Sequence, residues 1–317
     1  MYDFKNKRVL VAGGTGLIGT PLVEMLLEKG ALVSVVSLDN PSRAHPDVEF
    51  SRLDLTDFTN CMRSCCRMEY VFNLLCVKGS PTTVKARPAH LLVPQLLFNT
   101  NLMESARRNG AEGFLFTSSI GIYDTAQVFR EDSVWDTPLP QNDRFPACAK
   151  RAGELQAEAY RIEYGWNSIS IVRPANTYGP FDDFESDAAM VVPSFIRKVV
   201  SRIHPLCVRG DGSEVRDFVY ARDVARGMIL VAEQGVTDPV NLGSGVGVSI
   251  RELLDIVCQE AGEKPSIEWD PRQYGGDRIR VMDVTRASAL GFRPEISLRK
   301  GISDTIKWYR DHKLGSA

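Results

Sequence analysis

Three glycines near the start of the chain have the spacing of a phosphate-binding turn. An apolar run, Val9–Ala12, is followed by glycines at positions 13, 16 and 19. Such glycines permit a tight turn, a close approach of the backbone to a pyrophosphate, and close packing of a helix whose N-terminus faces the anion. We therefore predict a dinucleotide-binding turn whose contacts are Gly13, Thr15, Gly16, Leu17, Ile18 and Gly19.

An acidic residue follows at the distance that such a site requires. Asp39 ends the next apolar run, twenty residues after Gly19. A carboxylate at this position accepts hydrogen bonds from the adenosine ribose. Its charge repels the 2′-phosphate of NADP, so Asp39 favours NAD as the cofactor and makes NADP the less favoured one. The nearby Arg43 weakens this preference.

The elements that must position these residues alternate along the first half of the chain. Short apolar runs predict strands at Arg8–Ala12, Leu32–Ser37, Glu49–Leu53, Tyr70–Leu74, Gly113–Thr117 and Ser168–Val172. Helical periodicity predicts helices that include Leu17–Lys29, Leu96–Asn109, Lys150–Tyr164, Pro193–Val200 and Ile250–Glu260. This order is typical of the α/β class, with a Rossmann-type doubly wound parallel sheet that binds ligands at the carboxyl ends of its strands.

The regular alternation ends after Pro174, where stretches rich in Asn, Gly, Pro and Asp predict a smaller mixed α/β lobe for the substrate. We expect residues 1–175, with returning segments near 215–245, to form the NAD-binding Rossmann domain. Residues 176–214 and 246–317 would form the second lobe. The cleft between the lobes is the expected site.

Composition narrows the class of protein. The chain has 317 residues, 44% of them hydrophobic, and a net charge of -2 without long runs of either sign, so we expect neither a nucleic-acid partner nor a membrane partner. No apolar run has the length of a membrane span. The seven cysteines lack paired CxxC spacing and the four histidines are scattered. We therefore expect reduced thiols in a cytoplasmic protein, and no metal site.

The glycine spacing resembles that of the extended short-chain dehydrogenase/reductases, which epimerise, dehydrate, reduce or decarboxylate nucleotide sugars. Segments similar to this family are Asp54-Leu55, Thr117–Tyr123, Arg173–Pro180, Gly210–Phe218, Asn241–Gly245 and Leu290–Pro294. By this resemblance, Asp54 and Leu55 lie on the adenine side of the cofactor. Residues 149–154, 180–184 and 191–193 resemble the GDP-fucose synthase branch, which favours a GDP-linked sugar over UDP- or dTDP-sugars.

The resemblance also implies catalytic and substrate-binding residues. The family uses a Ser or Thr, a Tyr and a Lys, of which Ser119 and Lys150 match the first and last, whereas the Tyr position is Pro146. The lysine would also bind the nicotinamide ribose. The residues implied in substrate binding are Ser119, Asn176, Val191, Arg216 and Arg280. Among them, Asn176 and Arg216 would hold the diphosphate, because the planar fork of an arginine pairs with phosphate oxygens.

Other family groups are also replaced. The acidic pair of the dehydratases falls on Ile120 and Gly121, and the Cys base and His acid of the GDP-fucose synthases fall on Gly121 and Met190. Dehydration and double epimerisation are therefore not expected, and a simple hydride transfer at C4 of the sugar is. The substitutes for the Tyr remain open: the Ser119 hydroxyl relaying to water, the Tyr123 phenol or the Cys148 thiol.

Three functions follow from this resemblance. The first is an NAD-dependent oxidoreductase of carbohydrate biosynthesis that oxidises a GDP-hexose or GDP-heptose at C4. The second is a nucleotide-sugar epimerase with hydride transfer at C4, and the third is a non-catalytic protein that binds NAD and a sugar nucleotide. Relatives commonly form homodimers through the helices that correspond to Leu96–Asn109 and Lys150–Tyr164, so we expect a homodimer.

Overall fold

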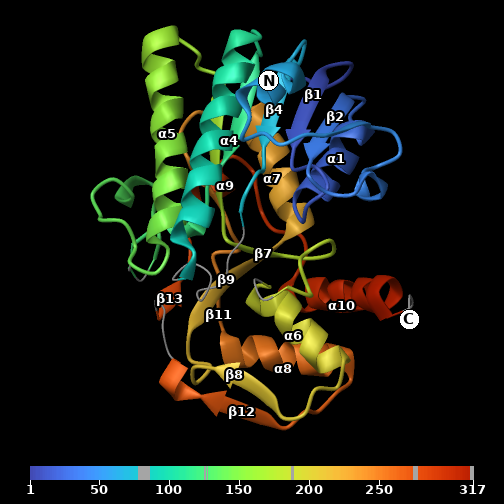
Figure 1. The fold of residues 1–317 in the computed structure, drawn as a ribbon. Helices are drawn as coiled ribbons and strands as arrows, with labels where there is room; N and C mark the ends of the chain where they lie inside the picture. The colour runs from blue at the N-terminus through green and yellow to red at the C-terminus, as the bar shows by residue number, and fades with distance from the viewer. Residues whose placement is uncertain (78–85, 125, 127, 187–188, 274–277, 315–317) are drawn as a thin grey trace.

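The computed structural model describes residues 1–77, 86–124, 126, 128–186, 189–273 and 278–314. A large parallel sheet with flanking helices forms one end of the molecule, and a smaller lobe forms the other (Figure 1). The strands of the large sheet are β1 (Arg8–Ala12), β2 (Leu32–Ser37), β3 (Glu49–Arg52), β4 (Tyr70–Asn73), β5 (Gly113–Thr117), β6 (Ile169–Pro174) and β10 (Val240–Leu242). Among the described residues, no helix is both long and apolar enough to cross a lipid bilayer.

The order of these strands is β10-β6-β5-β4-β1-β2-β3, and every pair is parallel. The chain runs outward from β1 in one direction through β2 and β3, and in the other direction through β4, β5 and β6. The change of direction leaves a crevice at the carboxyl ends of β1 and β4, which is where such sheets bind ligands. The predicted Rossmann-type doubly wound sheet is confirmed.

Helices cover both faces of the large sheet. The helices are α1 (Gly19–Glu28) and α7 (Ala221–Glu233) on one face, and α2 (Phe58–Ser64), α4 (Pro88–Arg108) and α5 (Arg144–Tyr164) on the other. Because successive side chains of a strand point to opposite faces, Val9 and Val11 pack under α1 and α7 while Leu10 packs under α2 and α4. Burial on both faces explains the continuous apolar runs of these strands.

The smaller lobe is built around β9 (Val215–Tyr220). This strand pairs antiparallel with β11 (Gly247–Ser249) and parallel with β7 (Asn176–Tyr178) and β13 (Ile279–Arg280). A separate parallel pair joins β8 (Leu206–Arg209) to β12 (Ile267–Asp270). The helices of this lobe are α6 (Val191–Val200), α8 (Ile250–Ala261) and α10 (Leu298–Tyr309), which enclose a third apolar core.

The remaining short elements connect these layers. They are α9 (Thr285–Ala289), the 3-10 turns Pro41–Arg43, Ile120–Ile122, Glu131–Ser133 and Pro271–Gln273, and the π-helical turn Arg310–Leu314. The α9 segment lies against β10 of the large sheet. Late parts of the chain thus return to the first lobe, where Met282 and Phe292 enter its core.

Two predicted helices begin too late in the sequence. The structure starts α4 at Pro88 rather than Leu96, and α5 at Arg144 rather than Lys150. Pro146 is compatible with α5 because it lies in the first turn, where a backbone N–H has no partner within the helix. The earlier start of α5 matters for the site, because it adds almost two turns before Lys150.

Candidate functional site

The glycine turn after β1 closes tightly around its own backbone. Gly13 has φ +84, which favours glycine, and its N–H donates to the carbonyl of Val36 at 2.8 Å. A Cβ on Gly19 would lie 2.2 Å from the Gly13 oxygen, so only glycine fits there. A Cβ on Gly16 would meet only that same oxygen within 4 Å, at 3.4 Å. The Gly16 backbone therefore borders open space, as a pyrophosphate contact requires.

Asp39 is held at the end of β2, next to this turn. The Thr15 hydroxyl donates to Asp39 Oδ2 at 2.6 Å, and the Asp39 N–H donates to the Ser37 hydroxyl at 3.1 Å. The carboxylate remains 39% exposed, and Arg43 lies 3.6 Å from its other oxygen. Asp39 is therefore oriented by the fold and accessible to a ribose, while Arg43 is close enough to influence which dinucleotide binds.

The predicted adenine-side pair separates into an exposed and a buried residue. Asp54 Oδ1 accepts hydrogen bonds from the backbone and the hydroxyl of Thr56, at 2.9 and 2.8 Å, in a turn before α2. Leu55 is buried in the core beneath α2 and α4. Contact of either residue with an adenine ring stays a prediction.

Lys150 lies buried on α5 and points to the carboxyl ends of two strands. Its ammonium donates to the carbonyl of Thr117 at 2.8 Å and to that of Leu75 at 3.2 Å. Burial lowers the pKa of Lys150, and the nearby Cys76 and Glu154 partly oppose this. Among the described residues these two carbonyls are its hydrogen-bond acceptors, so a third donor remains for a ligand.

Ser119 lies two residues after the end of β5 and is half-buried at the same edge of the sheet. Its oxygen accepts the N–H of Gly121 at 3.0 Å, which leaves the hydroxyl hydrogen able to donate. A side chain at Gly121 would project between two oxygens. Its Cβ would lie 3.3 Å from the Ser119 oxygen and 3.8 Å from Oδ2 of Asp143.

Asp143 is a residue that sequence analysis missed. It stands at the N-terminus of α5 and accepts a hydrogen bond from Arg280 of β13 at 2.8 Å. The side chains are 30% and 13% exposed, respectively. This ion pair joins the two lobes beside Ser119. The available signal was the spacing of seven residues from Lys150, which places both residues on one helix face once α5 is known to begin at Arg144.

The other residues implied in substrate binding come from the second lobe. Arg280 and Arg216 are register partners on β13 and β9, so both side chains lie on one face of that sheet. The Asn176 amide donates to the carbonyl of Asp217 at 2.9 Å, next to Arg216. Val191 begins α6 and packs against the apolar core of this lobe. The structure thus brings Arg280 to the Ser119 region, with Arg216 beside it.

A buried carboxylate fixes the strand that carries Arg216. Asp217 accepts the backbone N–H groups of Ser244, Gly245 and Met282 at 2.8, 3.0 and 3.3 Å. Burial raises the pKa of Asp217, although the hydrogen bonds from Ser244 partly oppose this. The carboxylate ties β9 to the two loops that flank it, so its role is to position neighbouring residues.

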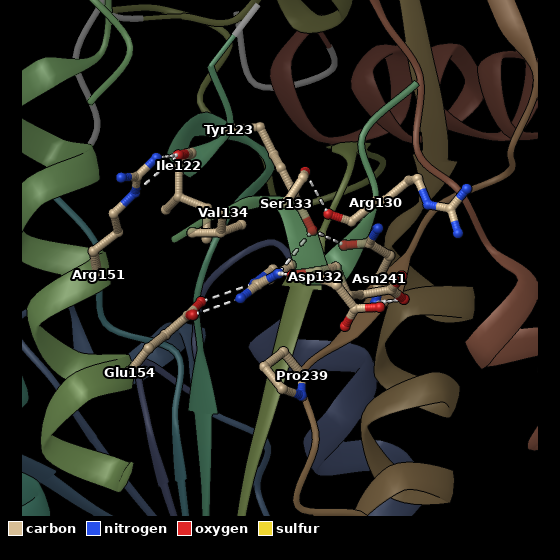
Figure 2. A network of polar contacts seen from close by, with 12 residues as sticks. Ile122, Tyr123, Arg130, Asp132, Ser133, Val134, Arg151, Glu154, Pro239 and Asn241 are labelled. Atoms are coloured by element: carbon tan, nitrogen blue, oxygen red, sulfur yellow. Dashed lines mark hydrogen bonds and ion pairs between the residues drawn. The ribbon is translucent and has the colours of Figure 1, made fainter. Parts of the chain in front are cut away.

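Tyr123 belongs to a buried polar network beneath the site. Its phenol donates to Asn241 at 2.6 Å and accepts from Arg173 at 2.9 Å. Burial raises the pKa of Tyr123 to about 12. Figure 2 shows Tyr123, Asn241 and Glu154 converging from three segments. Because Tyr123 is 2% exposed and its phenol both donates and accepts within the network, it cannot replace the missing Tyr as a proton acceptor.

The centre of that network is an ion pair between β6 and α5. Arg173 donates to both oxygens of Glu154, at 2.9 and 2.6 Å, and both side chains are buried. Burial alone would lower the pKa of Arg173, but the hydrogen bonds to Glu154 outweigh it and the pKa is raised. Glu154 lies one helical turn after Lys150, so the pair fixes α5 beneath the site.

Comparison with known proteins agrees with this geometry. A family model described as the NAD dependent epimerase/dehydratase family matches residues 9–243. The chain is 30% identical to GDP-L-fucose synthase 1 of Arabidopsis thaliana, over 96% of this chain and 94% of that protein.

Solved structures show the same likeness. The fold is similar to UDP-glucose 4-epimerase of Thermotoga maritima with UDP-glucose, at 29% identity and a TM-score of 0.87 over 96% of this chain and 99% of that one. It is also similar to UDP-glucose 4-epimerase of Thermus thermophilus in complex with NAD, at 29% identity and a TM-score of 0.85 over 96% and 99% of the two chains. The resemblance stated from the sequence is confirmed.

Proposed function

This chain belongs to the NAD dependent epimerase/dehydratase family, and from that premise we propose that it oxidises a nucleotide sugar at C4. The proposed substrate is a GDP-hexose or GDP-heptose. The observation that carries the proposal is the position of Lys150 and Ser119 at the carboxyl ends of β4 and β5, with Arg280 reaching their region from the second lobe. Oxidation needs a bound cofactor and, next to it, an anchored sugar nucleotide.

The residues that would hold the cofactor fit a dinucleotide. The turn Gly13–Gly19 leaves backbone space beside Gly16 for a pyrophosphate, and Asp39 is accessible for the ribose hydroxyls. Lys150 retains a donor for the nicotinamide ribose. When bound, NAD supplies the acceptor for the hydride that leaves the sugar. We propose NAD rather than NADP because the Asp39 carboxylate repels a 2′-phosphate.

The residues proposed to hold the substrate are Asn176, Val191, Arg216 and Arg280, together with Ser119. Two adjacent arginines suit a diphosphate, because each planar fork can bind two phosphate oxygens. The Ser119 hydroxyl would donate to the reacting sugar oxygen. We favour GDP as the nucleotide because of the likeness to a GDP-L-fucose synthase over almost the whole chain.

A second candidate function is a 4-epimerase. The TM-score of 0.87 with a UDP-glucose 4-epimerase supports it. In that case the hydride removed from C4 would return to the other face of the same sugar. An epimerase yields an isomer of unchanged mass without an external oxidant, whereas a dehydrogenase needs one, so product analysis separates the two.

The experiment is to follow the near-ultraviolet absorbance of reduced nicotinamide in the purified protein. GDP-mannose, GDP-heptose and UDP-glucose are added in turn, with and without a 2-keto acid as oxidant. We expect a GDP-sugar to raise the absorbance and the oxidant to reverse it. An isomer formed without oxidant would favour the epimerase, and an unchanged cofactor with every sugar would favour a non-catalytic binder.

We divide the chain between the two ligands as follows. Residues 1–175 with the returning segments near 215–245 would bind NAD, and residues 176–214 and 246–317 would bind the sugar nucleotide, although α9, Met282 and Phe292 of the last segment pack on the large sheet. In the returning segment, α7 and β10 pack on the large sheet, whereas β9 pairs with strands of the small lobe. All seven cysteines are unpaired, which suits the reducing cytoplasm that we propose as the location.

We also propose a homodimer formed through α4 and α5. These two helices pack side by side on one face of the large sheet. Apolar side chains remain exposed on both of them, namely Val93, Leu97, Leu155 and Ile162. Because residues four or seven positions apart share a helix face, Val93 and Leu97 form one stripe and Leu155 and Ile162 another. Covering these stripes with a second copy would remove them from water.

A further inference from the structure

We propose that Asp143 exchanges the proton of the reacting sugar oxygen, in the role for which position 146 offers only a proline. The inference rests on the proposed oxidation of a nucleotide sugar. Removal of a hydride from a hydroxyl-bearing carbon requires a group that accepts the hydroxyl proton. Pro146 has no such group, whereas the Asp143 carboxylate lies one turn earlier on the same helix.

The helix places Asp143 on the face that carries Lys150. Residues seven apart in an α-helix lie on the same face two turns apart. Asp143 is the N-cap residue of α5: its backbone angles are not helical, but its carbonyl accepts the N–H of Ala147 at 2.8 Å, which joins it to the first turn of the helix. Positions 143, 146 and 150 therefore form one row, and the row points to the carboxyl ends of β4 and β5, where Lys150 donates its hydrogen bonds.

The carboxylate also borders the space beside Ser119. A Cβ on Gly121 would have the Ser119 hydroxyl at 3.3 Å and Asp143 Oδ2 at 3.8 Å as its nearest atoms. The Ser119 hydroxyl and the Asp143 carboxylate therefore lie beside the same glycine, and both border the place where we expect the reacting hydroxyl. Ser119 can then donate to the sugar oxygen while Asp143 accepts from it.

The step balances with these groups. The O–H bond of the sugar hydroxyl breaks and its proton moves to Asp143, directly or through Ser119. The electron pair of that bond forms the carbonyl as hydride leaves the carbon for the oxidised nicotinamide. A carboxylate can accept several hydrogen bonds, so Asp143 can keep Arg280 on Oδ2 and still receive the hydroxyl proton.

Arg280 is the positioning residue for this carboxylate. Its side chain is 13% exposed and crosses from β13 to Asp143. The guanidinium donates to Oδ2 and so holds the Asp143 carboxylate in place beside Ser119. Arg280 is also proposed to bind the diphosphate of the substrate. Substrate binding would therefore bring the reacting sugar hydroxyl close to the Asp143 carboxylate, which Arg280 holds.

The test compares Asp143→Ala with a matched control, Asp132→Ala. Asp132 also forms an ion pair with an arginine at 2.8 Å, Arg286, but it is 82% exposed and no proton role is proposed for it. Cofactor reduction is followed in single turnovers with the GDP-sugar, with and without added formate. Affinity for NAD and for GDP is measured separately by calorimetry.

We expect Asp143→Ala to slow cofactor reduction at a saturating concentration of the GDP-sugar by about 10²-fold or more, with the affinity for NAD near its wild-type value. Formate, a small carboxylate, should raise the rate of cofactor reduction by Asp143→Ala at least about tenfold and leave the rate of Asp132→Ala unchanged. Arg280→Gln should raise KM, because it removes a phosphate contact. Asp143→Asn, which keeps the shape of the side chain, should be as slow as Asp143→Ala and shows whether the charge matters.

Three outcomes would overturn the inference. An active wild type with an unimpaired Asp143→Ala variant rejects the role of Asp143 and leaves the proposed function intact, as does a slow variant that formate does not accelerate. A wild type that leaves the cofactor unchanged with every nucleotide sugar rejects the proposed function, and the role of Asp143 falls with it.

Discussion

The ammonium of Lys150 donates to the carbonyl oxygen of Thr117 at 2.8 Å, two residues before Ser119. This bond links the middle of the site on α5 to the end of β5. The lysine is 4% exposed, and burial lowers its pKa. A charge kept in such a place costs stability, which is characteristic of residues retained for function.

The first prediction is that Lys150→Met stabilises the fold at neutral pH while cutting activity by at least about 10²-fold. Below the lowered pKa of the folded state, Lys150 is charged in the folded and unfolded chains, so the wild type bears the full cost of burying the charge. As pH rises from that value towards the unfolded value of about 10.4, the folded state loses its proton first and the wild type gains stability. The advantage of the methionine should therefore shrink with rising pH.

Denaturant unfolding of both proteins at several pH values checks this prediction. Lys29→Met serves as control, because Lys29 forms an ion pair with Glu233 on the surface and its side chain is 42% exposed. The difference in the free energy of unfolding between Lys29→Met and the wild type should not change with pH in this way. An advantage of Lys150→Met that grows with pH would contradict the proposed cause.

The second prediction concerns the choice of dinucleotide. Asp39→Asn should weaken NAD binding by about 1 kcal/mol, roughly the net value of a hydrogen bond. It should strengthen NADP binding, because the repulsive charge disappears and Arg43 is freed from its ion pair with Asp39 to meet a 2′-phosphate. Calorimetric titration with each dinucleotide measures the change. Asp47→Asn, on the exposed loop after Arg43, is the control, and an unchanged affinity ratio in Asp39→Asn would exclude the assigned role.

Much of the first lobe was predictable because its strands are apolar on both faces. The bounds of β1, β2 and β5 coincide with those expected from Arg8–Ala12, Leu32–Ser37 and Gly113–Thr117. Such runs differ sharply from the polar turns that bound them. The glycine turn was also predictable, because Gly13, Gly16 and Gly19 each meet a different steric requirement of a phosphate-binding turn.

The interlobe contacts were not predictable from the chain in the same way. The predicted helix began at Lys150, so Asp143 lay outside it and its alignment with Lys150 was hidden. Its partner Arg280 lies 137 residues away, and no local pattern specifies so distant a pair. The role of Tyr123 likewise depended on Asn241, with which it forms a hydrogen bond across 118 residues.

The third prediction tests the buried ion pair beneath the site. Glu154→Gln removes the charge that compensates Arg173, and leaving an uncompensated buried charge typically costs about 3–5 kcal/mol. We expect a loss of this size in the free energy of unfolding, measured with denaturant. Glu158→Gln lies one turn later on α5 and is exposed, so its effect should stay within about 0.5 kcal/mol. Equal effects of the two substitutions would contradict the structural role of the pair.

The fourth prediction tests the homodimer. The side chains of Leu97 on α4 and Ile162 on α5 are 44% and 79% exposed, and a charge placed in an apolar interface is costly to desolvate. Leu97→Glu combined with Ile162→Glu should therefore convert the native particle from the mass of two chains to that of one, as measured by light scattering. Leu32→Glu changes a side chain of similar exposure, 59%, at the start of β2, and should leave the dimer intact. A wild-type monomer, or a double variant that still dimerises, would show that α4 and α5 do not form the interface. Because neither Leu97 nor Ile162 is among the residues proposed to bind NAD, loss of the dimer alone should leave NAD affinity unchanged.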